Sequence, residues 1–188
     1  MKYDFKVIAI GSSAGGLDPM KKIIGLLPVD INAAIVIISH LPAKKPSNLK
    51  KILERFTEIP VVKVMDTLKI EKGHIYVLGE GVMMMMGDGG LVVRPRGEDE
   101  VINKAIDHFF LSMAADAGSS GIGVILSGAG YDGVEGAKAI ENENGLVIVQ
   151  QPYTAQFPLM PQALIANDHP DYVLTPGEIA DKLIERCR

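Results

Sequence analysis

The sequence lacks the features that mark secreted and membrane-spanning proteins. Its 188 residues include one cysteine, Cys187, so no disulfide can form within the chain. No apolar run approaches the roughly 20 residues that a membrane-spanning helix needs. The charged segment 1–6 leads straight into an apolar run and does not resemble a signal peptide. We therefore expect a cytoplasmic protein that is not itself a membrane protein.

Basic charge and metal ligands are also scarce. The 19 Lys and Arg residues are outnumbered by 23 Asp and Glu, so the net charge is −4 and gives no global reason to expect nucleic acid as a partner. No two of the 4 histidines have the spacing of metal ligands, so we expect no metal and no cofactor. Apolar residues (47%) and glycine (20 residues) are abundant, which is typical of an α/β protein. The length suits one domain over residues 1–188.

The most informative stretch joins an apolar run, residues 7–10, to the turn Gly11-Ser12-Ser13-Ala14-Gly15 and then to an amphipathic pattern. This order predicts a strand, a tight turn and a helix. The turn fits G-x-S-x-G, the nucleophile elbow that lifts a serine clear of a sheet. Gly-rich turns of this kind also bind phosphate, and many only connect two elements. The dinucleotide-binding pattern fails, because Ser13 occupies the place of its second glycine.

Strand and helix patterns alternate along the rest of the chain. Continuous apolar runs at 33–38, 123–126 and 146–149 predict strands buried on both faces, as in a parallel sheet. We expect an α/β fold, a doubly wound, mostly parallel sheet with helices on both faces. Further strands are expected at 61–64 and 172–174, and helices at 17–27 with Asp18 as N-cap, 47–56, 103–117, from Gly133 to about 143 with Gly145 at C′, 161–166, and after the capping box 175–178.

The segment 72–95 has a different sequence pattern. Short apolar stretches at 74–78, 82–86 and 91–94 are separated by glycine turns, which predicts a small antiparallel hairpin or meander inserted into the fold. Its four consecutive methionines, 83–86, could form an adaptable binding surface, but methionine at strand spacing more often fills a core. We therefore expect them in the core.

Three of the apolar strands end in groups that could do chemistry, Ser13, His40 and Asp132. Because the carboxyl ends of parallel strands meet at one edge of a sheet, these side chains are expected to converge. Together they have the composition of a hydrolytic triad, with Ser13 as nucleophile, His40 as base and Asp132 holding the imidazole. The other histidines, at 74, 108 and 169, are expected to be structural or exposed.

The chain resembles the catalytic domain of the CheB family, the chemotaxis receptor protein-glutamate methylesterases. The resemblance runs in register over nearly the whole chain and is carried by the segments 10–17 (IGSSAGGL), 38–42 (ISHLP) and 123–133 (GVILSGAGYDG), with Gln150 and Met160-Pro161. Ala14 and the segment 106–110 look closer to the branch that stands alone or is fused to a receptor methyltransferase.

The resemblance implies a function and assigns residues to it. It implies a doubly wound fold and hydrolysis of γ-glutamyl methyl esters on receptor helices, with deamidation of receptor glutamines in some members. It assigns the nucleophile to Ser13, the histidine to His40 and the aspartate to Asp132. The oxyanion donors would be backbone N–H groups at Ala14 and near His40 and Ala129. The implied partner is a methyl-accepting receptor with acidic helices, and a receptor methyltransferase or a regulatory protein is a further candidate.

The sequence departs from the family pattern in three places. We expect no receiver domain in this chain, so phosphorylation control within it is not inferred. Lys104-Ala105 replaces the familiar Arg-Pro, and Leu78-Gly79-Glu80 replaces a proline-containing turn. These two changes bear on substrate docking and not on the three catalytic residues. Two other functions stay open: a binding or regulatory module with little turnover, and an esterase that acts on another substrate.

The stretch between Leu41 and Phe56 carries five basic residues against the single acid Glu54, in a chain whose net charge is −4. Its first lysines, Lys44 and Lys45, begin four residues after His40 and are expected near the mouth of the site. A charge run is usually a solvated surface. Here it would attract the acidic receptor helix that the resemblance implies.

Reversing both Lys44 and Lys45 to glutamate is expected to slow receptor demethylation strongly at low salt, because it removes electrostatic steering. Hydrolysis of a small neutral ester should change little. Rates measured on both substrates across a salt series test this. An equal loss on both substrates would show that the lysines support the fold, and no loss on either would make the run an ordinary solvated surface.

Overall fold

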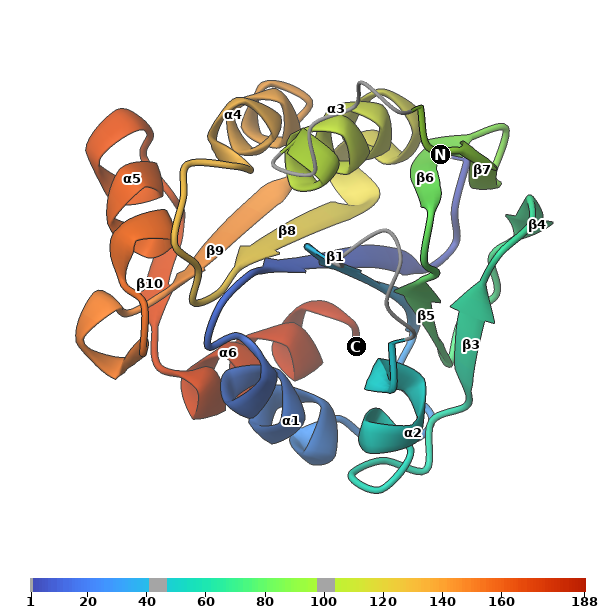
Figure 1. Cartoon of the computed structure of the whole chain (residues 1–188), viewed down its shortest axis with the longest axis horizontal. Coiled ribbons are helices and arrows are strands. Elements are labelled where there is room, and N and C mark those ends of the chain that lie inside the picture. Colours follow the sequence, from blue (N-terminus) through green and yellow to red (C-terminus); the bar gives the residue numbers. More distant parts are fainter. Residues whose placement is uncertain (1, 41–46, 98–103) are drawn as a thin grey trace.

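The computed structural model describes residues 2–40, 47–97 and 104–188. Its centre is one sheet of 7 parallel strands in the order β10-β9-β8-β1-β2-β5-β3 (Figure 1). In chain order the strands are β1 (Lys6–Ser12), β2 (Ala33–Ser39), β3 (Val61–Val64), β4 (Leu68–Lys69), β5 (His74–Leu78), β6 (Val82–Gly87), β7 (Gly90–Pro95), β8 (Gly121–Ile125), β9 (Leu146–Gln150) and β10 (Tyr172–Leu174).

Helices cover both faces of this sheet. They are α1 (Leu17–Leu26), α2 (Leu49–Leu53), α3 (Ala105–Ala117), α4 (Val134–Asn142), α5 (Leu159–Asn167) and α6 (Pro176–Arg186). Figure 1 shows α3 and α4 on one face and α1 and α6 on the other. The doubly wound α/β fold expected from the alternating patterns is confirmed. Across the described ranges, no helix is both long and apolar enough to cross a membrane.

The central strands bury both of their faces, which explains their continuous apolar runs. Along β1, Val7 and Ala9 belong to the core cluster that contains the buried residues of α3. Ile8 and Ile10 belong to the second cluster, with the buried residues of α1 and α6. Successive side chains therefore point alternately to the α3 face and the α1 face of the sheet. This alternation decides where the residues just beyond β1 and β2 point.

The inserted antiparallel sheet differs from the expectation in one strand. It consists of β4, β7 and β6. The stretch His74–Leu78, expected in the hairpin, is instead β5 of the main sheet, parallel to both β2 and β3. Four of its five residues are buried, as in an inner parallel strand. The glycine turn after it, 79–81, therefore leads the chain out of one sheet and into another. Met84 and Met86 of β6 lie in the core cluster on the α3 face and Met83 is also buried, as expected, whereas Met85 is only partly buried.

Several helix ends also differ from the expectation. Helix α1 begins at Leu17 with Gly16 as N-cap, so Asp18 lies in its first turn and is not the cap. Helix α2 is short, Leu49–Leu53. After α4 the left-handed position is taken by Asn144, with φ 61°, and not by Gly145. Asparagine tolerates this conformation better than most residues, and the pattern alone did not separate it from its glycine neighbour. The capping box of Thr175 and Glu178 at α6 is confirmed.

Carboxylates meet where α4 packs near the end of α5. Glu141 of α4 lies near Asp168, the residue that follows α5, and near Asp171. Solvent does not reach Glu141 Oε1 or Asp168 Oδ2. Desolvation, followed by the like charges of Asp168 and Asp171, raises the pKa of Glu141 from 4.5 to about 7. The folded state thus holds this proton over a pH range in which the unfolded chain has lost it.

The stability of the protein is therefore expected to fall as the pH rises from about 4.5 to about 7. Glu141→Gln should remove this dependence and make the protein more stable than the wild type at pH 8, with little gain at pH 5. The free energy of unfolding, measured with urea at pH 5 and at pH 8, tests this prediction. Glu143→Gln, on the exposed end of the same helix, is the matched control and should follow the wild type. Equal effects of the two substitutions at both pH values would contradict the prediction.

Candidate active site

The site lies where the strand order reverses. After β1 the chain forms β2, β3 and β5 on one side of β1, and it later crosses to β8 on the other side. In open sheets of this kind, ligands bind at the carboxyl ends of the strands beside such a switch point. Ser13 follows β1, His40 follows β2, and Asp132 lies in the loop after β8.

The register of β1 and β2 places Ser13 beside His40. The two strands pair as far as Ser12 and Ser39, which lie opposite each other. The hydroxyls of this pair are 3.3 Å apart, and both residues line a cavity against α1 and α2. Since side chains alternate along a strand, the next residue on each chain, Ser13 and His40, turns to the α3 face. Ser12 is buried and, unlike Ser13, does not line the cavity that contains Asp132.

The turn after Ser13 requires glycine at two positions. Gly15 has φ 72°, in the left-handed region. A Cβ on Gly16 would lie 2.4 Å from the Cβ of Ser12, so no larger residue fits there without movement. The backbone N–H of Ser13 donates to the carbonyl of Ser127 at 3.0 Å, which ties the elbow to the end of β8.

Ser127 holds the elbow in place through hydrogen bonds. Its side chain is fully buried, and Oγ donates to the carbonyl of Ala14 at 2.8 Å and accepts from the N–H of Phe157 at 3.0 Å. Its own N–H donates to Oε1 of Gln150 at 3.0 Å. Buried polar groups that are satisfied in this way fix a single geometry. The same loop holds Gly128, where a Cβ would lie 3.1 Å from the Cβ of Ser13.

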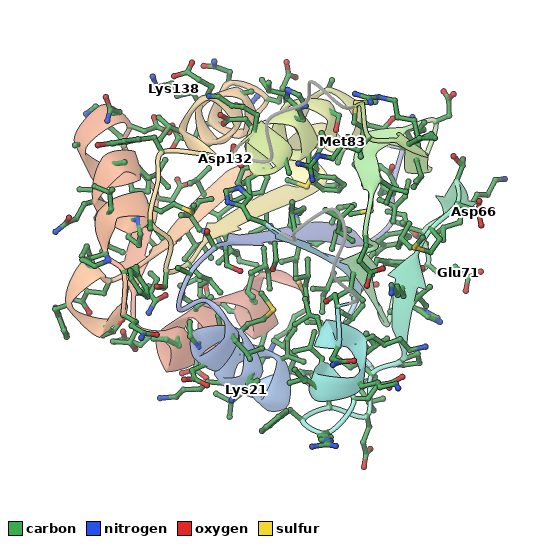
Figure 2. All side chains as sticks on the ribbon, viewed as in Figure 1. Lys21, Asp66, Glu71, Met83, Asp132 and Lys138 are labelled. Atoms are coloured by element: carbon green, nitrogen blue, oxygen red, sulfur yellow. The ribbon has the colours of Figure 1, made fainter. Side chains whose placement is uncertain are left out.

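Asp132 connects His40 to helix α3. His40 Nε2 and Asp132 Oδ2 are 2.8 Å apart, and the side chains are 13% and 1% exposed. The carboxylate also accepts the N–H of Ile106 at 2.9 Å and the N–H of Asp107 at 2.8 Å. Figure 2 shows Asp132 on the inner side of the α3 and α4 pair, whereas Lys138 of α4 points outward. The first turn of α3 and the imidazole therefore hold the same carboxylate from two sides.

A cavity of about 460 Å³ brings the three predicted residues together. Ser13, His40 and Asp132 line it, along with Lys104 and the segment 129–131. Ser13 and His40 also line the smaller cavity of about 270 Å³ on the α1 side, so they lie between the two. Among the described residues no hydrogen bond joins the Ser13 hydroxyl to His40. The arrangement has an imidazole held by a carboxylate and a serine on the neighbouring strand that faces the same space.

The other predicted positions are distributed as follows. Ala14 follows Ser13 in the elbow, and Ala129 lines the larger cavity. Lys44 and Lys45 lie outside the described residues. The remaining histidines are not among the residues that line this cavity, and His74 contacts the carbonyl of Lys72. No group of three metal-ligating side chains comes together within the described ranges.

Asp107 was not predicted as part of the site. The sequence offered one signal, an acidic residue in the first turn of an apolar helix, a place where carboxylates often cap. That signal is common at helix starts and does not reveal which other backbone the carboxylate reaches. Lys104 appeared in the sequence only as a departure from a family pattern. Its place in the wall of the cavity comes from the structure.

Comparisons with known proteins identify the family of the chain. The family model described as CheB methylesterase matches residues 8–183. A protein of Leptospira interrogans serovar copenhageni named putative protein-glutamate methylesterase/protein-glutamine glutaminase is 33% identical over 182 residues, which cover 96% of this chain and 94% of that protein. A Thermotoga maritima protein-glutamate methylesterase/protein-glutamine glutaminase is 33% identical over 185 residues, 96% of this chain but 54% of that protein.

A solved structure shows the same fold. The crystal structure of the Thermotoga maritima CheB methylesterase catalytic domain superposes with a TM-score of 0.88 at 29% identity, covering 97% of this chain and 99% of that one. The segments that carry the elbow, His40 and Asp132 all fall within the matched range 8–183. The chain belongs to the CheB methylesterase family.

Proposed function

We propose that this protein is a cytoplasmic serine hydrolase that removes methyl groups from γ-glutamyl methyl esters of chemotaxis receptors. The observation that carries the proposal is the 2.8 Å contact between His40 Nε2 and Asp132 Oδ2 in a cavity that Ser13 also lines. The names of the relatives support the substrate class. The same chemistry with ammonia as leaving group would deamidate a receptor glutamine. The acting unit is one catalytic domain, residues 1–188, and its partner is the acidic receptor helix.

In the proposed reaction His40 accepts the proton of the Ser13 hydroxyl while the serine oxygen attacks the ester carbonyl. The Nε2–H group of the neutral ring donates to Asp132, so Nδ1 is the basic atom left for Ser13. This orientation is the reverse of the chymotrypsin arrangement, in which the carboxylate binds Nδ1. As the ring becomes positive, the buried carboxylate of Asp132 stabilises it.

The developing oxyanion needs N–H donors that have no other partner. Ser13 itself does not supply one, because its N–H already donates to Ser127. The proposed donors are the backbone N–H groups of Ala14, His40 and Ala129, as the family resemblance implies. The bond from Ser127 Oγ to the Ala14 carbonyl holds the Ala14–Gly15 peptide, which adjoins the peptide whose N–H is the proposed donor. Donors fixed in this way stabilise charge without reorganising during the reaction.

The remaining steps balance without a cofactor. The tetrahedral intermediate collapses, the proton on Nδ1 passes to the leaving oxygen, and methanol departs. The glutamyl group is then esterified to Ser13. Water, deprotonated by the same Nδ1, attacks this ester and releases the glutamate carboxylate and the free serine.

Ser13→Ala or His40→Ala is expected to remove nearly all turnover, up to about a millionfold, and the double variant should be scarcely worse because the residues act as a unit. Asp132→Asn should cost about ten-thousandfold, because an amide favours the wrong imidazole tautomer. The rate of methanol release from a methylated receptor measures the activity of all four variants. A double variant far worse than either single variant would contradict the assigned roles.

Ser12→Ala is the matched control, one residue from the nucleophile but on the opposite face of the sheet. Its activity should stay close to that of the wild type, since its hydroxyl contacts Ser39. Labelling with a fluorophosphonate, mapped by mass spectrometry, should modify Ser13 in the wild type and in Ser12→Ala. A label on Ser12, or none on a folded wild-type protein, would overturn the proposal.

A further inference from the structure

Asp107, a buried acid outside the proposed catalytic three, binds the backbone that follows Asp132. Its side chain is 4% exposed. Oδ1 accepts the N–H of Gly133 at 3.0 Å and the N–H of Gly136 at 2.9 Å. These are the N-cap and the third residue of α4, the helix that starts just after Asp132. Asp107 thus supplies the capping acceptor that glycine at the N-cap lacks.

Asp132 does the same for the helix that carries Asp107. Lys104, the N-cap of α3, makes no side-chain capping bond. The carboxylate of Asp132 accepts the N–H groups of Ile106 and Asp107 instead, at 2.9 and 2.8 Å. Each acid therefore caps the helix that begins beside the other. Neither carboxylate can shift without disturbing the backbone to which the other is attached.

At Gly133 and Gly136, where α4 starts beside α3, the neighbouring atoms leave no room for a larger residue. A Cβ on Gly136 would lie 2.3 Å from the Cβ of Phe110 in α3, and a Cβ on Gly133 would lie 3.0 Å from Ile106 Cγ2 in α3 and 2.6 Å from Ile125 Cδ1 in β8. Gly133 also has φ 101°, which favours glycine. Both N–H groups that Asp107 accepts belong to buried residues. Truncation of Asp107 would leave two buried donors unpaired directly after Asp132.

The carboxylates of Asp107 and Asp132 pair with different basic side chains. Asp107 Oδ2 is paired with Lys104 Nζ at 3.1 Å, whereas Asp132 Oδ2 is paired with His40. Within the described ranges Asp107 bonds to Lys104 and to α4 and not to Ser13 or His40. Asp107 therefore acts on the reaction indirectly, through the backbone after Asp132 or through Lys104 in the wall of the cavity.

We propose that Asp107 is a positioning residue, which holds the backbone after Asp132 so that one carboxylate reaches His40 and the start of α3 together. This inference rests on the proposed function, because it assigns a role in that reaction. The competing explanation is that Asp107 only stabilises a helix. The two differ in what a substitution changes: the rate at which Ser13 reacts, or the stability alone.

Three variants distinguish these explanations. Asp107→Ala removes the acceptor. Asp107→Asn keeps one oxygen for Gly133 and Gly136 and loses the ion pair with Lys104. Asp116→Asn is the matched control, because Asp116 lies on the same helix with a side chain 9% exposed and pairs with Lys2 and Tyr3, away from the site.

The experiment measures fluorophosphonate labelling of Ser13, separated into the maximal rate and the half-saturating concentration, at a temperature where circular dichroism shows every variant folded. Asp107→Ala is expected to lower the maximal rate by up to about 100-fold, since small misplacements of catalytic groups have effects of that size. The half-saturating concentration should not change. Asp107→Asn should restore most of the rate. Asp116→Asn should lose stability and keep the full rate.

A second measurement reads the His40 to Asp132 contact directly. The low-field NMR signal of the His40 ring N–H should weaken or move in Asp107→Ala and stay in place in Asp116→Asn. A wild-type labelling rate in Asp107→Ala would overturn the proposal, as would rate losses that match between Asp107→Ala and Asp116→Asn. If the folded wild type is not labelled at Ser13, the hydrolase proposal fails. The His40 signal then decides separately, and an unchanged signal in Asp107→Ala overturns the role of Asp107.

Discussion

The carboxylate of Asp132 is the point on which the rest of the site depends. Its oxygens accept two N–H groups from the first turn of α3 and contact His40 Nε2. The first turn of α3 holds the carboxylate in place, and the carboxylate fixes the orientation of the imidazole. A polar group that is almost fully buried costs little free energy only when partners such as these replace its water. The position of His40 is therefore set by a helix that follows it by more than sixty residues.

The sheet adds a second constraint, which acts through register. Ser12 and Ser39 pair across β1 and β2, so the residues that follow them emerge at the same level on the same face. The elbow then needs little more than two glycines and the buried hydroxyl of Ser127 to keep Ser13 in place. Strand pairing supplies the approximate placement, and the buried polar bonds supply the final geometry.

Sequence reasoning reached the fold class and the convergence of Ser13, His40 and Asp132, because both follow from strands that end at a common edge. It placed His74–Leu78 in the hairpin, since the apolar periodicity of a short strand does not name its partners. It could not find the bonds of Asp107 to Gly133 and Gly136, which join residues 26 and 29 positions apart. Contacts of that kind depend on how two helices dock, and no local pattern encodes them.

The edges of the main sheet have a consequence for behaviour at high concentration. The outermost strands, β10 and β3, have three and four residues. Unpaired backbone on a long, flat edge invites another chain to add a strand, which leads to aggregation. Both edge strands of the main sheet are short. On the β3 edge, Lys63 also forms an ion pair with Glu80. The main sheet therefore offers another chain only a short length of edge on which to add a strand.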